Sequence, residues 1–339
     1  MSREANFELL RPAALVRISA KGRAAAFVSA DHGVSLYNSS GKLCWSVQWD
    51  EKILDVLPLE NGACYLAMEG ALLLVDAQGS ESARQAFEAP PFIQSYHLGL
   101  SGDGSVLMLH TPWFLHFFSA DLQSESGRIS CEQTGHFMKF AALSPDGMRV
   151  YFAGAKLVED EGRGTEARWG CWAKGPEGWH AQWAGAEESG YNSHLRGLAL
   201  SADGRRLVAE LYCGGYEFRI FDSDGNLLWK RSGDHPVLSP HGSLVLWEDP
   251  SAGLTLSIVA TRERSWSRRS EDRVRWKAVS DLGECLALEG RRWVCSSRDG
   301  AQKWSVWLMN DTDHVAAAGG SLALADGFRG AMLRFPWNA

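Results

Sequence analysis

The sequence reads Leu143-Ser144-Pro145-Asp146-Gly147 in one place and Leu200-Ser201-Ala202-Asp203-Gly204 in another, and this pattern decides the fold. In each copy an apolar stretch ends in Leu-Ser, and a short turn containing Asp-Gly follows. Asp-Gly supplies the positive φ angles that a tight hairpin turn needs. The residues after the first turn, Arg149-Val150-Tyr151-Phe152, have the composition of a β-strand. Each copy therefore predicts a β-hairpin.

The hairpin pattern recurs along the whole chain. The further copies, from clear to faint, are Leu100–Gly104, Leu238–Gly242, Ile18–Gly22, Val279–Gly283, Asn61-Gly62 and Gly319-Gly320. Successive glycines are 37 to 43 residues apart, except for one interval of 57 residues between Gly147 and Gly204. A period of about 40–45 residues with four strands per unit is typical of a β-propeller. The sequence thus predicts an all-β fold: a single closed β-propeller of eight four-stranded blades, with seven blades as the alternative.

A second repeat is in phase with the first and places Trp four residues after Gly. Its copies are Gly41 to Trp45, Gly225 to Trp229 and Gly300 to Trp304. Each copy lies where the third strand of a blade should turn into the fourth, and Trp266 occupies the matching place in another unit. Large aromatic side chains bury much area when they pack between blades. We therefore expect Trp45, Trp229 and Trp304 to be structural.

The two ends of the chain predict how the fold closes. The last unit lacks a fourth strand after Phe328–Phe335, whereas the N-terminal segment Asn6–Arg11 supplies one strand to spare. Pairing the two would remove an exposed sheet edge. We expect residues 1–339 to form one domain, with residues 156–178 as an inserted hairpin or loop in the fourth blade.

These repeats resemble two groups of propellers. The Ser-Pro-Asp-Gly and Ser-Ala-Asp-Gly turns are similar to those of WD-repeat proteins, and the Gly-x-x-x-Trp units resemble the tryptophan-docking repeats of quinoprotein-like propellers. The resemblance implies the fold over nearly the whole chain, but these folds serve many functions. The Trp-Asp dipeptide of WD repeats is missing from its usual place, and there is no adjacent Cys-Cys pair as in quinone-dependent dehydrogenases.

Composition excludes several classes of partner. The net charge is −7, whereas a general nucleic-acid-binding protein would carry a basic field. We find no signal peptide and no apolar run that could span a bilayer. The seven cysteines contain no Cys-x-x-Cys motif, which fits a reducing cytoplasm. We expect a monomeric cytoplasmic protein that binds neither nucleic acid nor membrane.

One rim of the predicted propeller is the expected binding face. It is built from the loops between blades and the loops between second and third strands, and aromatic residues and Arg are enriched at the centres of interfaces. The residues that we expect there are Trp113, His136, Trp169, Tyr191, His194, Tyr216 and Arg291. We expect the 156–178 insertion beside them. The sequence therefore favours a non-enzymatic scaffold that binds a protein partner.

Two alternatives remain open, both with a site at the mouth of the central channel: a hydrolase or lyase, or a sensor of a small ligand. Asp50, Asp311 and Asp313 are the nearest candidate carboxylates. His97, His110, His116 and His136 lack metal-site spacing, so we expect no metal and no cofactor. The basic stretch Arg262–Lys277 is diluted by acidic residues, and we expect its charges mostly to face solvent on the outer edge.

Overall fold

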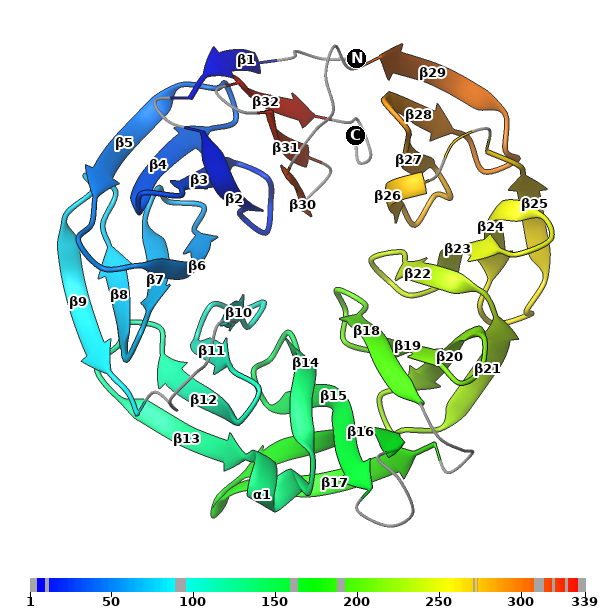
Figure 1. Cartoon of the computed structure of the whole chain (residues 1–339), viewed down its shortest axis with the longest axis horizontal. Helices are drawn as coiled ribbons and strands as arrows, with labels where there is room; N and C mark the ends of the chain where they lie inside the picture. Colours follow the sequence, from blue (N-terminus) through cyan, green and yellow to red (C-terminus); the bar gives the residue numbers. More distant parts are fainter. Residues whose placement is uncertain are drawn as a thin grey trace. The chain divides into compact units, whose positions relative to one another are not determined.

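The computed structural model describes residues 5–9, 12–88, 96–158, 164–187, 193–270, 272, 274–307, 314–318, 321–326 and 329–334. Its strands form eight four-stranded antiparallel sheets, shown in Figure 1. Seven sheets use four consecutive strands each, and the eighth combines strands from both ends of the chain. The chain divides into two compact units: Met1–Gly99, Phe117–Ser126 and Met309–Ala339 form the first, and Leu100–His116 and Gly127–Leu308 form the second.

The sheets with strands in the first unit begin with β2 to β5. These strands are β2 (Ala13–Ile18), β3 (Ala24–Ser29), β4 (Gly33–Asn38) and β5 (Leu43–Gln48), followed by β6 (Ile53–Pro58), β7 (Cys64–Met68), β8 (Ala71–Val75) and β9 (Glu81–Ala86). The composite sheet has the order β1-β32-β31-β30, from β1 (Ala5–Glu8), β30 (His314–Ala318), β31 (Ser321–Asp326) and β32 (Arg329–Arg334). A further sheet consists of β10 (His97–Leu100), β11 (Val106–His110), β12 (Phe114–Ser119) and β13 (Glu125–Ser130).

Four sheets lie in the second unit. They comprise β14 (Phe137–Leu143), β15 (Arg149–Val158), β16 (Gly164–Gly175) and β17 (Gly178–Ala186); β18 (His194–Leu200), β19 (Arg206–Tyr212), β20 (Tyr216–Asp222) and β21 (Leu227–Ser232); β22 (Asp234–Leu238), β23 (Leu244–Asp249), β24 (Gly253–Ile258) and β25 (Arg264–Arg268); and β26 (Val274–Val279), β27 (Cys285–Glu289), β28 (Arg292–Ser296) and β29 (Gln302–Trp307). One short helix, α1 (Cys131–Thr134), is capped by Ser130.

The predicted pairing between the two chain ends is present. Figure 1 shows β1 beside β32. The two strands run antiparallel, with Ala5 opposite Met332 and Glu8 opposite Arg329. β2 lies next to β30 and β31, so the composite sheet adjoins the β2–β5 sheet within the first unit. The N-terminal strand therefore completes a sheet that the C-terminal strands cannot finish alone.

The glycine turns are formed as the repeat predicts. In seven of the eight turns, from Gly22 to Gly283, the glycine has a positive φ; Gly320 lies outside the described residues. Each turn joins the first and second strands of a sheet. The second strands that follow are the most buried: all residues of β3 and β7 are buried, whereas the fourth strand β9 alternates between exposed and half-buried positions. The core therefore lies between adjacent sheets, and the fourth strands face outward.

Tryptophans on the fourth strands join one sheet to the next. Trp45 is 6% exposed, and its Nε1 donates a hydrogen bond to the Gly62 oxygen of the following sheet at 2.9 Å. Its ring also packs on Gly79, where a Cβ would come within 3.2 Å of the Trp45 Cβ. Trp229 is 7% exposed and packs edge-on against Phe218 and against Trp247 of the next sheet. The structural role predicted for these two residues is confirmed; the Trp304 side chain lies outside the described residues.

The strand register adds Trp183 to this set and confirms the matching position of Trp266. In several sheets a β-bulge precedes the same position of the fourth strand, and that position is Trp45, Trp183, Trp229, Trp266 or Trp304. Trp183 packs on Gly225 and Trp266 packs on Gly300, just as Trp45 packs on Gly79. The glycine therefore recurs because the third-to-fourth turn of one sheet must admit the Trp of the preceding sheet.

The 156–178 segment lengthens an existing sheet. β15 and β16 pair over ten residues, from Arg149 opposite Ala173 to Val158 opposite Gly164, and residues 159–163 lie outside the described residues. The segment thus extends the second and third strands, which are 10 and 12 residues long. Within the described residues, no helix is long and apolar enough to cross a membrane.

Candidate functional site

A rigid turn presents Trp113 at the end of its sheet. In Thr111-Pro112-Trp113-Phe114 the Thr111 N–H donates to the Phe114 oxygen at 2.9 Å, and the Phe114 N–H donates to Thr111 Oγ1 at 3.0 Å. Pro112 fixes one φ of the turn. Trp113 is 39% exposed, and its ring meets Phe137 edge-on with centroids 4.5 Å apart. The indole is therefore held in one orientation while much of it faces solvent.

A row of rings crosses the β18–β21 sheet at the corresponding end. His194, Tyr212 and Tyr216 are paired residues on three neighbouring strands, with ring centroids 5.2 and 5.3 Å apart. The Arg196 guanidinium lies 4.5 Å from the centre of the Tyr216 ring, which is a cation–π contact. Tyr216 remains 44% exposed after the Gly214-Gly215 turn. We call His194, Arg196, Tyr212 and Tyr216 the Tyr216 cluster.

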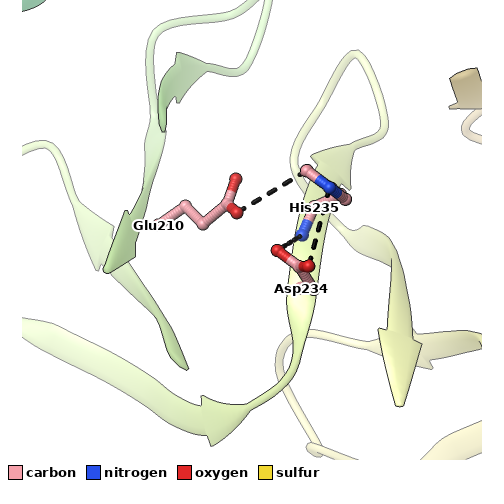
Figure 2. Close-up of side chains that lie close together, drawn as sticks. All are labelled: Glu210, Asp234 and His235. Atoms are coloured by element: carbon pink, nitrogen blue, oxygen red, sulfur yellow. Dashed lines mark hydrogen bonds and ion pairs between the residues drawn. The ribbon is translucent and has the colours of Figure 1, made fainter. Parts of the chain in front are cut away.

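Arg196 connects this cluster to a second group, which consists of Glu210, Asp234 and His235 and which we call the carboxylate–histidine cluster (Figure 2). Arg196 Nη1 lies 2.7 Å from Asp234 Oδ1 and 3.3 Å from Glu210 Oε1. His235 Nδ1 is 3.6 Å from Glu210 Oε1, and His235 Nε2 is 3.6 Å from Asp234 Oδ2. The imidazole therefore lies between two carboxylates.

Local backbone features bring these three residues together. Glu210 is on β19, and Gly197 opposite it leaves room, since a Cβ there would lie 3.1 Å from Glu210 Oε2. Asp234 and His235 begin β22, whose register shifts between Asp234 and Val237. His235 adopts a φ of 49°, which is uncommon for a residue other than glycine. The bulge therefore turns His235 toward the neighbouring sheet.

Burial and neighbouring charges shift the pKa values of the carboxylate–histidine cluster. Burial, together with the Asp234 carboxylate, raises the pKa of Glu210 to about 7. Burial opposes ionisation of Asp234 as well, but hydrogen bonding from Glu210 and the nearby His235 and Arg196 lower its pKa overall. The pKa of His235 is lowered, chiefly by burial. Lys277, buried beside Glu248, also has a lowered pKa because of burial.

Two residues expected on the binding face are in the interior, which corrects the prediction. His136 is 7% exposed, with Nδ1 2.9 Å from the Thr134 oxygen and its ring against Phe152. Trp169 is 4% exposed in the middle of β16, where it packs on Phe221. The Trp169 ring packs against Phe221 and the Arg219 guanidinium of the next sheet, and the His136 ring lies against Phe152. They cannot contribute to a surface.

The remaining predicted positions are distributed as follows. Trp113, His194 and Tyr216 lie at the expected ends of their strands. Arg291 is exposed in the turn between β27 and β28, and Tyr191 lies outside the described residues. The predicted binding face therefore keeps Trp113, His194, Tyr216 and Arg291 among the described residues.

Comparison with known proteins identifies the fold. No known family model matches the chain, and no curated protein matches it. Solved structures do match: Sqt1 from Saccharomyces cerevisiae has a TM-score of 0.69 at 11% identity, covering 99% of this chain and 100% of that chain. BamB from Moraxella catarrhalis has a TM-score of 0.66 at 12% identity, covering 97% and 98%. The C-terminal WD40 domain of Sif2 has a TM-score of 0.66 at 10% identity, covering 98% of both.

The chain has a β-propeller fold. The resemblance to WD-repeat and quinoprotein-like propellers is confirmed at this level, and each four-stranded sheet is a blade. At these identities the likeness shows the fold alone. The functional site of this propeller must therefore be argued from its own side chains.

The structure gives little support to the alternative functions, an enzyme or a small-ligand sensor with a site at the channel mouth. Asp50 is exposed after β5, while Asp311 and Asp313 lie outside the described residues. His110 and His116 are buried, and His110 Nε2 lies 3.0 Å from the Met138 oxygen. In the basic stretch, Arg264 pairs with Asp249 at 3.0 Å, but Lys277 is buried rather than facing solvent. Arg262, Arg264 and Arg269 are exposed, as expected of most charges in the stretch, whereas Lys277 is buried because it lies on a first strand, next to Glu248.

Five residues of the site were not predicted: Arg196, Glu210, Tyr212, Asp234 and His235. They converge because β18, β19 and β22 lie side by side with bulges that no repeat motif reveals. A usable signal was present at Asp234-His235-Pro236, where polar residues precede the Leu238-Ser239 turn. First strands of other units have mainly apolar residues there.

Proposed function

We propose that this propeller is a non-enzymatic scaffold that binds a protein partner through the rim carrying Trp113 and the Tyr216 cluster. The observation that carries the proposal is the exposure of two large, rigidly held aromatic rings. Trp113 is 39% exposed and Tyr216 is 44% exposed, although each contacts another aromatic ring. Tyr, Trp and Arg supply most of the binding energy at protein interfaces.

The Trp113 and Tyr216 rings are already ordered in the unbound protein. The Trp113 turn and the Tyr212–Tyr216 strand pair hold the side chains in place before any partner arrives. Rings that are already ordered lose little conformational entropy on association. The guanidinium of Arg196 over Tyr216 adds a donor that can bind a carboxylate or a backbone carbonyl of the partner. These features favour protein recognition over a purely structural role for the rim.

The proposal includes one closed domain of eight blades. The pairing of β1 with β32, and the position of β2 beside β30, support closure from the side of the first unit. All seven cysteines are free, which supports a reducing compartment such as the cytoplasm.

We further propose that the extended β15–β16 hairpin lies beside the binding rim, because its loop joins second and third strands, as the Trp113 turn does.

The test compares both rims of the same protein. Three forms of the tagged chain are used to capture proteins from native cells: the unmodified chain, the Trp113→Ala/Tyr216→Ala variant and a Met148→Ser/Leu282→Ser variant. Quantitative mass spectrometry measures what each form captures. Met148 and Leu282 are 46% and 66% exposed and lie in first-to-second turns, at the opposite ends of the strands.

We expect the aromatic variant to lose its specific partner while the control keeps it, and reconstitution with the purified partner should reproduce the difference. Removing two central aromatic side chains should weaken binding by about 2 kcal/mol or more. Full capture by the aromatic variant, with loss in the control, would refute this assignment of the rim.

A further inference from the structure

The carboxylate–histidine cluster has the donors and the spacing of a metal site. Glu210 comes from one blade, and Asp234 and His235 come from the next, so two sheets are needed to build it (Figure 2). One donor atom from each residue lies within 4.8 Å of the other two. In a tetrahedral zinc site with bonds of about 2.0–2.1 Å, neighbouring donors are about 3.3 Å apart. The 3.6 Å between His235 Nδ1 and Glu210 Oε1 is near this spacing, whereas Asp234 Oδ2 faces the other ring nitrogen, Nε2, so the Asp234 carboxylate must also move for all three residues to share one metal.

A buried carboxylate oxygen supplies independent support. Glu210 is 7% exposed, and its Oε1 accepts no hydrogen bond from any described residue. The same oxygen faces His235 and lies 3.3 Å from Arg196, which gives it an ion pair without hydrogen-bond geometry. A buried polar atom left without a hydrogen bond is destabilising. A cation between Glu210 and His235 would satisfy it.

When all three of its carboxylates are ionised, the cluster and its surroundings carry an unbalanced negative charge. Three carboxylates (Glu210, Asp234 and Glu248) interact with two cations (Arg196 and Lys277). A metal-binding imidazole is neutral, so His235 would not change this balance. A dication would therefore enter a site that already favours positive charge.

Access to the cluster is open on one side. The side chains of His235 and Asp234 are 39% and 23% exposed, whereas Glu210 is at the buried end. Solvent can therefore reach the donors and provide a water ligand. Arg196 is 26% exposed and also contacts the Tyr216 ring, so it has a second partner besides the carboxylates.

We propose that Glu210, Asp234 and His235 bind a divalent transition metal of the zinc class, with water as a fourth ligand. An imidazole with two carboxylates suits zinc, whereas magnesium prefers an all-oxygen site. Arg196 occupies the carboxylates in the absence of the metal and is displaced by it. This site shares Arg196 with the proposed protein-binding rim, but its metal-binding test does not depend on that function.

The test is a calorimetric titration of the intact chain with Zn²⁺, with Mg²⁺ as the comparison ion. The variants are His235→Asn, Glu210→Gln, Arg196→Gln and His241→Ala. Asn tolerates the left-handed backbone of residue 235. His241 is the matched control, since it pairs with Asp281 but is 72% exposed. Co²⁺ absorption of the unmodified protein reports the coordination without any substitution.

We expect one Zn²⁺ per chain and tetrahedral Co²⁺ bands. His235→Asn and Glu210→Gln should weaken binding by about 100-fold or more, because losing a metal ligand should exceed the roughly 10–100-fold effect of losing an outer-shell partner. His241→Ala should bind normally, and Arg196→Gln should bind more tightly because the competing guanidinium is gone. The proposal is overturned if Zn²⁺ does not saturate, if Mg²⁺ binds equally well, if His241→Ala loses as much affinity as His235→Asn, or if Arg196→Gln weakens binding.

Discussion

At the scale of single residues, stability depends on the tryptophans that join adjacent blades. Trp45 and Trp229 are nearly buried, whereas Trp113 is 39% exposed. Changing Trp45 or Trp229 to Ala should lower the free energy of unfolding by about 3–5 kcal/mol, because it removes buried area and leaves a cavity. The Trp113→Ala control should lose much less. Urea unfolding of the three variants measures the difference, and equal losses would contradict the distinction between scaffold and surface.

The same tryptophans show what local sequence can and cannot predict. Trp45 and Trp229 were identifiable because the glycine turn and the Trp are only four residues apart in the chain. Trp183 occupies the equivalent position by register but was missed, since β16 and β17 are longer and Gly178 precedes it by five residues. The contact depends on register between strands, and insertions change the spacing without changing the register.

At the scale of elements, two turns of the same pattern differ in their surroundings. Gly104 and Gly147 have φ values of 74° and 67°. A Cβ at Gly104 would meet nothing within 4 Å, whereas a Cβ at Gly147 would lie 2.8 Å from Val106 Cγ2 of the preceding blade. Gly104→Ala should cost about 1–2 kcal/mol through backbone strain alone.

Gly147→Ala should cost a further 1–3 kcal/mol, roughly the effect of overpacking a core. Thermal unfolding of both variants tests this. Similar costs would mean that Val106 moves aside freely and that the turns are not packed against their neighbours.

The sequence predicted the site residues that lie in loops, but it missed those whose position depends on the pairing register of the strands. Tyr216 and His194 were found because their turns follow from glycine and polar residues. Trp169 was misplaced because β16 is 12 residues long, so that Trp169 lies within the strand and packs against Phe221 of the next blade. Asp234 and His235 were missed because a bulge, rather than a motif, brings them to Glu210. Which side chains meet between two blades depends on residues far apart in the sequence, and the spacing of the repeats gives no information about it.

At the scale of the whole molecule, the pairing of β1 with β32 should control global stability. Deleting residues 1–9 exposes the edge of β32 and removes four paired residues. We expect a loss of several kcal/mol, roughly half the stability of a typical domain. The melting temperature of the deletion variant is the measurement, and a variant that replaces residues 5–8 with another β-forming sequence should recover part of the loss. An unchanged melting temperature would argue against closure.

Repeated Ser–Asp contacts should make the propeller sensitive to acid. Hydrogen bonds from Ser101, Ser144 and Ser297 lower the pKa values of Asp103, Asp146 and Asp299 below the ordinary value of 3.8. A carboxyl whose pKa is lower in the folded state stabilises the fold above its unfolded pKa, and this contribution is lost as the pH falls through the folded pKa. The melting temperature should therefore fall steeply below pH 3.8, and Ser144→Ala should make the fall shallower. A melting temperature independent of pH in this range would contradict the prediction.

The composite sheet also has a consequence for synthesis of the chain on the ribosome. β1 emerges first, but its partner β32 follows only after roughly 320 more residues, which takes about 20–60 s at ordinary translation rates. During that time the seven other blades can assemble in order of their appearance, while β1 has no native partner. A chaperone that shields extended N-terminal segments would act on this strand, and translation pauses would prolong its exposure more than that of any other strand the structure describes.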